Sequence, residues 1–164
     1  MTTPPLGLVL FDPEIPQNTG NVARLTVAMG IPLHIVGEPA FSLSEKALRR
    51  AGVDYWPEVR LERHPSVWHL LRAVGGARIV PVTTRARVGL AEFRFRGGDL
   101  LCLGNESRGL PPEIHRDFGA DGVRIEQPGP VRSLNLATAA GIVAWEAMRQ
   151  LGTFGAETGP AGAR

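Results

Sequence analysis

The chain has 164 residues, of which 43% are hydrophobic and 21% are charged, and its formal net charge is +2. These values are typical of a globular protein with one full core. No apolar run is as long as a membrane-spanning helix, which needs about 20 residues. The single cysteine, Cys102, excludes an internal disulfide, and the apolar run around it predicts a small buried hydrophobic residue.

The N-terminus lacks a basic region and a cleavage site, so no signal peptide is predicted and a cytoplasmic protein is expected. Lys46 is the only lysine among the 18 basic residues, so the others are arginines. Arginine suits contacts with phosphates and bases, which leaves nucleic-acid binding open. We expect one domain over residues 1–153 and a flexible tail over residues 154–164.

A strand, a helix and a second strand are predicted at the start of the chain. Leu6–Phe11 is a continuous apolar run, as in strands of a parallel sheet that is covered on both faces. Asn18 or Asn21 is the expected N-cap of a helix that stops at Gly30. Leu33–Val36 follows at once as the second strand.

Two short helices are predicted in the middle of the chain. The first spans Ser44–Ala51 and is ended by Gly52. The second spans Ser66–Val74. Its spacing predicts that three apolar residues face the core, namely Trp68, Leu71 and Val74.

Three further strands are predicted, at Arg78–Val82, Asp99–Leu103 and Val123–Ile125. Between the first two, basic and aromatic residues alternate within Val88–Gly98, which indicates a short surface segment. Pro111 or Pro112 is expected to start a helix through His115, because proline suits the first helical position.

The longest predicted helix runs from Ser133, a natural N-cap, to Gly152. It carries few polar side chains, so it must be buried on more than one side. We expect one side to pack on the sheet and the other on a second copy of the protein. The apolar residues are Leu136, Ala140, Val143 and Ala147 on one face, and Leu134, Ile142 and Trp145 over much of the rest.

Strands and helices alternate through the chain, which predicts an α/β fold with a mostly parallel sheet and helices on both faces. Ligands bind such sheets at the carboxyl ends of the strands, where this chain has loops rich in Gly, Pro, Asn and Arg. Glycine-rich nucleotide motifs and the nucleophile elbow of hydrolases are absent from the sequence. The chemistry must therefore depend on a bound cofactor. No metal is assigned, because no cysteine or carboxylate stands at ligand spacing from the scattered histidines, His34, His64, His69 and His115.

Three of these loops resemble the signature motifs of the SPOUT-class RNA 2′-O-methyltransferases. The matching segments are Asn18–Asn21 with Arg24, Gly104–Leu110, and Arg132–Leu136. They occur in the order and at the separations of that family. Leu48–Tyr55 and the closing helix are most similar to the wobble-position tRNA methyltransferases of the TrmL type, and the resemblance covers nearly the whole chain.

The resemblance implies an α/β fold with a C-terminal trefoil knot, a homodimer, and S-adenosylmethionine as the cofactor. In this family the cofactor lies in the knot loops, largely against backbone groups. The positions that match by motif and are expected to bind it are Val82, Thr83, Gly104, Asn105, Glu106, Gly109, Ile125, Ser133, Leu134 and Asn135.

The resemblance also implies catalytic roles for Arg24, Asn18, Glu106, Ser133 and Asn135. The sulfonium carries an activated methyl group, so the protein must place a ribose hydroxyl in line with it and stabilise the developing alkoxide. A guanidinium is a poor base, so Arg24 is expected to stabilise the alkoxide or orient a phosphate. Asn18 is expected to position Arg24 or the ribose, and Glu106 to orient Arg24 or complement the sulfonium. Ser133 and Asn135 are expected to fix the cofactor and its loop.

Simpler structural roles stay open at several of these positions. Asn18 could serve only as a helix cap, and Ser133 could be both cap and site residue. Glu106 and Arg108 alone would form a solvated surface pair. The arginines expected to bind RNA are Arg24, Arg49, Arg50, Arg108 and Arg132.

The expected activity is methylation of the ribose 2′-hydroxyl of the wobble nucleotide, a cytidine or a uridine, in the anticodon arm of a tRNA. The nearest alternative is the same chemistry at another tRNA site or on ribosomal RNA. A catalytically silent RNA-binding protein on the same fold is the alternative from a different class, and the intact set of motif residues argues against it. Arg24 acts either in its own subunit or across the dimer interface.

Overall fold

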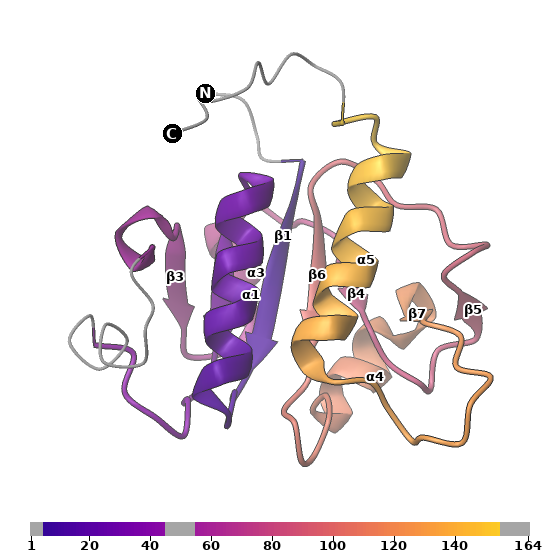
Figure 1. Cartoon of the computed structure of the whole chain (residues 1–164), viewed down its shortest axis with the longest axis horizontal. Coiled ribbons are helices and arrows are strands. Elements are labelled where there is room, and N and C mark those ends of the chain that lie inside the picture. Colours follow the sequence, from indigo (N-terminus) through magenta and orange to yellow (C-terminus); the bar gives the residue numbers. More distant parts are fainter. Residues whose placement is uncertain (1–4, 45–54, 155–164) are drawn as a thin grey trace.

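The computed structural model describes residues 5–44 and 55–154. A five-stranded parallel sheet lies at the centre of this part of the chain (Figure 1). In spatial order its strands are β3 (Leu61–His64), β2 (Leu33–Val36), β1 (Leu6–Phe11), β6 (Asp99–Leu103) and β4 (Ile79–Pro81). A separate parallel pair joins β5 (Val88–Gly89) to β7 (Val123–Arg124).

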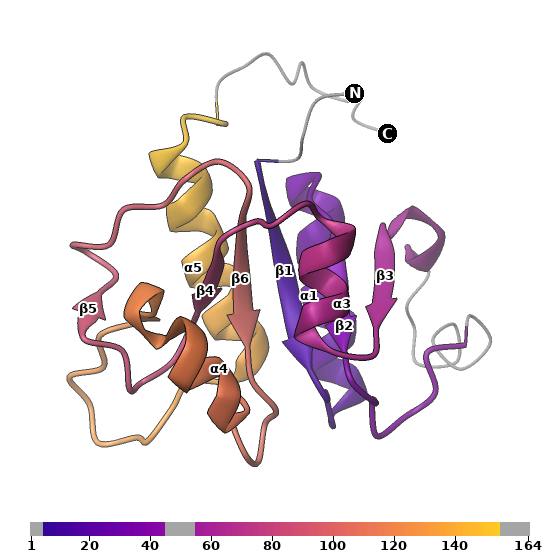
Figure 2. The ribbon, with the colours of Figure 1, turned by 180° about the vertical axis from the view of Figure 1, so that it is seen from behind.

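Helices cover both faces of the large sheet. On one face, α1 (Pro16–Met29) and α5 (Leu136–Gln150) lie side by side (Figure 1). On the other face lie α3 (Val67–Ala73) and α4 (Pro112–Phe118), as Figure 2 shows. The predicted α/β class with a mostly parallel sheet is therefore confirmed, whereas the trefoil knot stays a prediction. Two short 3₁₀ turns complete the described elements, at Trp56–Glu58 and Gly119–Asp121.

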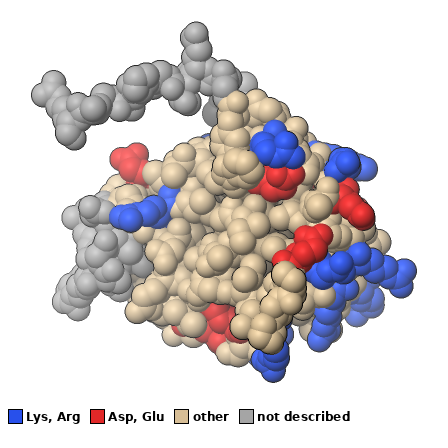
Figure 3. Space-filling model, turned by 45° about the vertical axis from the view of Figure 1, so that its right-hand side comes forward, with Lys and Arg blue, Asp and Glu red and all other residues tan. Residues whose placement is uncertain are grey.

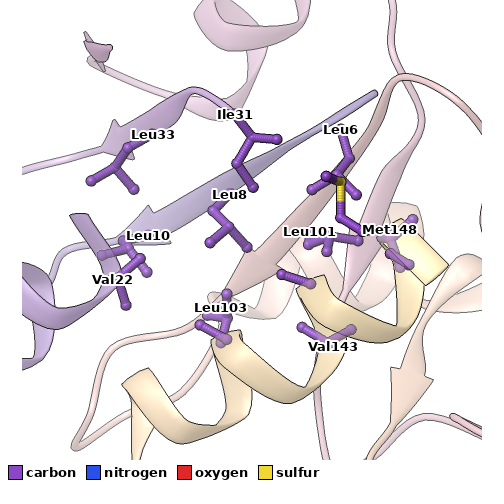
Figure 4. Packing of buried hydrophobic residues seen from close by; sticks show 14 of the residues in the cluster. Leu6, Leu8, Leu10, Val22, Ile31, Leu33, Leu101, Leu103, Val143 and Met148 are labelled. Carbon is purple, nitrogen blue, oxygen red and sulfur yellow. The ribbon is translucent and has the colours of Figure 1, made fainter. Parts of the chain in front are cut away.

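Two apolar cores lie on the two faces of the sheet, because successive side chains of a strand point in opposite directions. Leu8 and Leu10 of β1 belong to the larger core, where they lie beneath Val22 of α1 and Val143 of α5 (Figure 4). Val9 and Phe11 of the same strand belong to the second core. All six residues of β1 are buried, so its continuous apolar run is explained by cover on both faces.

Cys102 lies in the second core and is fully buried, as predicted. Burial raises the pKa of its thiol, because the thiolate would lose its hydration. The side chain therefore acts as a small hydrophobic residue of β6.

The predicted N-caps of the first helix are wrong. The helix begins at Pro16 with Ile15 as the N-cap residue, so Asn18 and Asn21 both lie inside α1. Proline fixes a helical φ and has no N–H to satisfy, which lets it start the helix without a side-chain cap. The predicted stop is confirmed, because Gly30 is the C-cap in the left-handed conformation with φ of 66°.

The predicted N-cap of the last helix is also wrong. Asn135, and not Ser133, caps α5, and its side-chain oxygen accepts hydrogen bonds from the backbone N–H groups of Ala137 and Thr138. The helix ends at Gln150, and Gly152 follows in the left-handed conformation, close to the predicted stop.

The inward face of α3 agrees with the prediction in part. The bounds and the Ser66 cap are as expected, and Leu71 and Val74 pack against the second core. Val67 and Leu70, however, are the buried residues of the helix. Trp68 is 51% exposed. A helix of only two turns can present either apolar stripe to the sheet, so the spacing alone did not decide its orientation.

The segment Val88–Gly98 is not wholly a surface segment. Phe93 and Phe95 are 6% and 8% exposed and their rings pack at 4.7 Å between centroids. The intervening arginines, Arg94 and Arg96, are exposed. The alternation of rings and charges therefore marks one buried and one solvated side of an extended chain.

Most of the predicted helix at Ser44–Ala51 falls outside the described residues, as does the predicted tail beyond Phe154. None of the described helices is long and apolar enough to cross a membrane.

A buried ion pair ties three segments together at the amino end of β6. Asp99 is 1% exposed, and its two carboxylate oxygens accept hydrogen bonds from Arg78 at 2.8 and 2.6 Å. The backbone N–H of Arg96 also donates to this carboxylate, at 2.8 Å. Arg78 in turn donates to the carbonyl of Arg94, and its guanidinium lies 5.3 Å from the ring centroid of Phe93. The hydrogen bond from Arg78 to Asp99 raises the pKa of Arg78.

We expect the substitution Asp99→Asn to lower the free energy of unfolding by about 3 kcal/mol, because it removes the buried counter-charge of Arg78 and leaves only the exposed Asp121, whose carboxylate lies 3.7 Å from the guanidinium. Urea denaturation followed by circular dichroism measures this change. The matched control is Asp117→Asn, which breaks a surface pair with Arg116 and should leave the midpoint unchanged. Equal effects of the two substitutions would contradict the role assigned to Asp99.

Candidate active site

A pocket of about 760 Å³ opens where the parallel strands end. Segments that follow β1, β4, β6 and β7 line it, which is the place where ligands bind sheets of this kind. Its volume suits a small-molecule cofactor. The lining includes every residue predicted to bind the cofactor, namely Val82, Thr83, Gly104, Asn105, Glu106, Gly109, Ile125, Ser133, Leu134 and Asn135.

The remaining predicted site residues divide into three groups. Asn18, Arg108 and Arg132 also line the pocket. Arg24 lies on α1 and is not part of the lining. Two of the predicted RNA-binding residues, Arg49 and Arg50, lie outside the described residues.

Asn18 joins two loops that are distant in the sequence. Its Nδ2 donates to Glu106 Oε1 at 3.3 Å, and its Oδ1 accepts a hydrogen bond from Asn135 Nδ2 at 2.9 Å. Only 7% of Asn18 is exposed, so both ends of the carboxamide need these partners. Asn135 continues the chain of hydrogen bonds by capping α5. Asn18 therefore fixes the pocket wall.

Glu106 anchors the start of α1. Its carboxylate accepts hydrogen bonds from the backbone N–H groups of Glu14 at 2.8 Å and Ile15 at 3.1 Å, besides the bond from Asn18. A carboxylate at a helix N-terminus is favourable, because unpaired N–H groups gather there. Glu106 thus holds the loop after β1 and Asn18, while its predicted action on Arg24 or the sulfonium stays a prediction.

The loop after β6 is closed tightly on itself. Asn105 and Gly109 exchange two backbone hydrogen bonds, of 3.0 and 2.8 Å, and the side-chain oxygen of Asn105 accepts from the N–H groups of Ser107 and Arg108. A Cβ atom at Gly104 would lie 2.1 Å from the carbonyl carbon of Gly109, so only glycine fits there. This packing fixes the backbone of the loop where it lines the pocket.

Arg24 is exposed on α1 and stacks on Tyr55. The guanidinium carbon lies 4.9 Å from the ring centroid, and the Tyr55 hydroxyl donates to the Gly20 carbonyl at 2.6 Å. The ring is thereby fixed to α1 and restricts the positions that Arg24 can take. The structure brings Asn18, Glu106, Ser133 and Asn135 together at the pocket, and it leaves Arg24 beside it.

Several residues that line the pocket were not among the predicted site residues, and two of them, Gln127 and His115, carry polar groups of interest. Gln127 lines it, and its buried Oε1 has no hydrogen-bond partner among the described residues, so a ligand that donates there would satisfy it. His115 also lines it, and burial, with a smaller effect of Arg85, lowers the pKa of the imidazole. Neither lies in a motif. Position after a strand was the only signal for Gln127.

The histidines are not all scattered, contrary to the sequence-based interpretation. His34 on β2 and His64 on β3 lie with Glu62 in one cluster, because strand pairing brings them together. None of the three lines the pocket.

Residues 5–145 match the SpoU rRNA Methylase family. The chain belongs to this family. A SpoU relative, the tRNA (cytidine(34)-2′-O)-methyltransferase of Escherichia coli (strain K12), is 40% identical over 152 residues, which span 92% of this chain and 97% of the relative. Comparison with solved structures also finds RNA methyltransferases. A structure described as "Structural insights into the 2-OH methylation of C/U34 on tRNA" superposes with a TM-score of 0.82 at 52% identity, over 90% of this chain and 97% of the other.

A third SpoU similarity concerns the cofactor. The SpoU methyltransferase AviRb from Streptomyces viridochromogenes, in complex with the cofactor AdoMet, superposes with a TM-score of 0.78 at 26% identity, over 92% of this chain and 59% of AviRb. The SpoU family uses S-adenosylmethionine. The pocket here fits that molecule, because the tightly closed Gly104–Leu110 loop lines it and the buried Oε1 of Gln127 has no hydrogen-bond partner among the described residues.

We expect Gly104→Ala to weaken S-adenosylmethionine binding by about ten- to hundredfold, because the added methyl group forces the Gly109 backbone out of place. Isothermal titration calorimetry measures the affinity. The control is Gly97→Ala, where the added Cβ meets no atom within 4 Å. If the Gly104→Ala variant bound S-adenosylmethionine as tightly as the unchanged protein, the loop after β6 would have no part in cofactor binding.

Proposed function

We propose that this protein transfers the methyl group of S-adenosylmethionine to the ribose 2′-hydroxyl of the wobble nucleotide, a cytidine or a uridine, in the anticodon arm of a tRNA. The observation that carries this proposal is the pocket, in which every cofactor position expected from the family motifs lies. The relatives compared above, named for this nucleotide, support the choice of substrate. A cytoplasmic location and the C-terminal trefoil knot belong to the same proposal.

The chemistry demands positioning more than reactive side chains. When bound, S-adenosylmethionine supplies an activated methyl group, so the reaction needs no metal ion. The chain's part is to hold the ribose hydroxyl in line with that methyl and to stabilise the negative charge that develops on the oxygen. Ser133, Leu134 and Asn135 form one wall for the cofactor, and Glu106 and Asn18 brace that wall.

Arg24 is the group that stabilises the developing alkoxide in this proposal. A guanidinium stays charged and can donate several hydrogen bonds, so it suits an oxyanion better than it suits proton removal. Tyr55 stacks on this guanidinium and limits its freedom before substrate binds. The hydroxyl proton then leaves through a phosphate oxygen or water.

We also propose that two copies of the chain form a homodimer through the exposed side of α5. Ile142 and Trp145 are 40% and 53% exposed there, although α5 is otherwise deeply packed. Figure 3 brings the α5 side toward the viewer, and most of that face carries no charged side chain, while arginines gather at the lower right. An uncharged face of this kind is typical of an interface between subunits.

The proposed dimer would bring Arg24 to the ribose bound at the partner's pocket. Arg24 does not line the pocket of its own chain, and it lies on α1, the helix next to α5. In the proposed dimer it acts on the ribose held at the partner's pocket. Arg108 and Arg132 line the pocket and are proposed to bind phosphates of the same RNA.

The first test incubates the protein with labelled S-adenosylmethionine and total tRNA from a strain that lacks the gene, and maps the label by nuclease digestion and mass spectrometry. We expect label on the wobble ribose. The Arg24→Ala variant should transfer methyl at least about a hundredfold more slowly, because one charged donor to the oxyanion is lost. Its S-adenosylmethionine affinity should be unchanged, since Arg24 is not in the pocket lining.

Arg72→Ala on α3 is the matched arginine control and should behave as the unchanged protein. Label at another tRNA position or only on ribosomal RNA would overturn the wobble assignment and keep the chemistry. S-adenosylmethionine binding without transfer to any RNA would favour a silent RNA-binding protein. Full activity of Arg24→Ala would remove Arg24 from the mechanism.

Mixed dimers test whether Arg24 acts across the interface. Arg24→Ala and Gly104→Val chains, each inactive alone, are unfolded, mixed in equal amounts and refolded together. If Arg24 acts on the partner's pocket, half of the dimers carry one complete site, and activity returns to about a quarter of that of the unchanged dimer. The same mixture without co-refolding is the control. Absence of recovery, with mixed dimers demonstrated by mass spectrometry, would place Arg24 and its cofactor in the same subunit.

A further inference from the structure

A histidine–glutamate–histidine cluster lies on the two strands at one edge of the sheet, outside the pocket. In the β2–β3 register His34 is paired with Glu62, and Val36 is paired with His64. Side chains alternate along a strand, so positions 34, 62 and 64 all project from the same face. β3 is the last strand of the described sheet, with β2 as its one neighbour in the strand order.

The three ligand-type atoms are as far apart as the ligands of one small cation. His34 Nδ1 lies 3.2 Å from His64 Nε2, and Glu62 Oε2 lies 3.8 Å from the first nitrogen and 3.7 Å from the second. Tetrahedral zinc has bonds of about 2.0–2.2 Å to nitrogen and oxygen, which separates neighbouring ligand atoms by about 3.4 Å. A small rotation of the Glu62 side chain, which is 57% exposed, closes the remaining difference.

The burial of the cluster also suits a cation. His34 and His64 are 2% and 7% exposed, and burial lowers the pKa of both imidazoles, which favours the neutral form that binds a metal ion. Glu62 supplies the negative charge at the solvent side of the cluster. This exposed side leaves room for a water molecule as the fourth ligand.

We propose that His34 Nδ1, His64 Nε2 and the Glu62 carboxylate bind one divalent transition-metal ion of the zinc class. The ion joins the edge strand β3 to β2 by bonds between side chains, in addition to the backbone hydrogen bonds of the pair. Its role is structural, because none of its ligands lines the pocket. Neutral imidazoles with one carboxylate match zinc better than magnesium or calcium, which prefer oxygen ligands.

The test uses the full-length protein after dialysis against a chelator, titrated with Zn²⁺ by calorimetry and with Co²⁺ by visible absorption. We expect one equivalent of Zn²⁺ per chain, a rise of the melting temperature, and the intense visible bands of a tetrahedral Co²⁺ site. The variants Glu62→Gln and His64→Gln should each weaken Zn²⁺ binding by about tenfold or more, since each removes a ligand.

His69→Ala is the matched control, because this exposed histidine on α3 lies outside the cluster and its Nδ1 is paired with the Ser66 hydroxyl. It should bind Zn²⁺ as the unchanged protein does. Failure to take up Zn²⁺, unchanged affinity in Glu62→Gln, or loss of binding in His69→Ala would overturn the proposal. If His64→Gln does not fold, Glu62→Gln still decides, because its side chain is half exposed.

Discussion

One carboxamide connects the loops on which the pocket depends. Asn18 donates to Glu106, which follows β6, and accepts from Asn135, which follows β7 and caps α5. These partners are 88 and 117 residues away in the sequence, yet they meet because parallel strands end at the same edge of the sheet. Since Asn18 is buried, loss of either bond leaves a polar group without water or partner. The pocket and the start of two helices are thus fixed by the same few bonds.

The apolar strands β1, β2, β4 and β6 could be predicted from the sequence, whereas β3 and β5 were missed and the starts of α1 and α5 were predicted wrongly. An apolar run such as Leu6–Phe11 has few alternatives, because burial on both faces of a parallel sheet demands it. Asparagine is a frequent helix cap, and that local preference favoured Asn18 and Asn21. In the structure Pro16 starts the helix and tertiary hydrogen bonds use the Asn18 side chain. A local preference of about 1 kcal/mol yields to a buried network of this kind.

The sequence could predict which residues line the pocket, but it could not predict which of them bond to each other. Motifs mark Gly104, Ser133 and Asn135 because backbone geometry and short polar side chains shape a pocket. Nothing in the sequence states that Glu106 binds Asn18 and the amides before α1, because those partners depend on the fold. The pairing of β2 with β3 explains the histidine cluster in the same way: a ligand spacing that is absent along the chain exists across two strands.

The position of Arg24 links the fold to the proposed assembly. Its guanidinium is exposed, stacked on Tyr55, and not part of the pocket lining of its own chain. The neighbouring helix, α5, leaves the large apolar side chains of Ile142 and Trp145 exposed on the side opposite its buried residues. In the proposed two-fold dimer, the same patch of both subunits forms the interface. The exposed apolar side of α5 would then be covered, and Arg24 would face the partner. A contact that covers the exposed side of α5 also carries the adjacent α1 toward the partner, and with it Arg24, which the pocket of its own chain does not include.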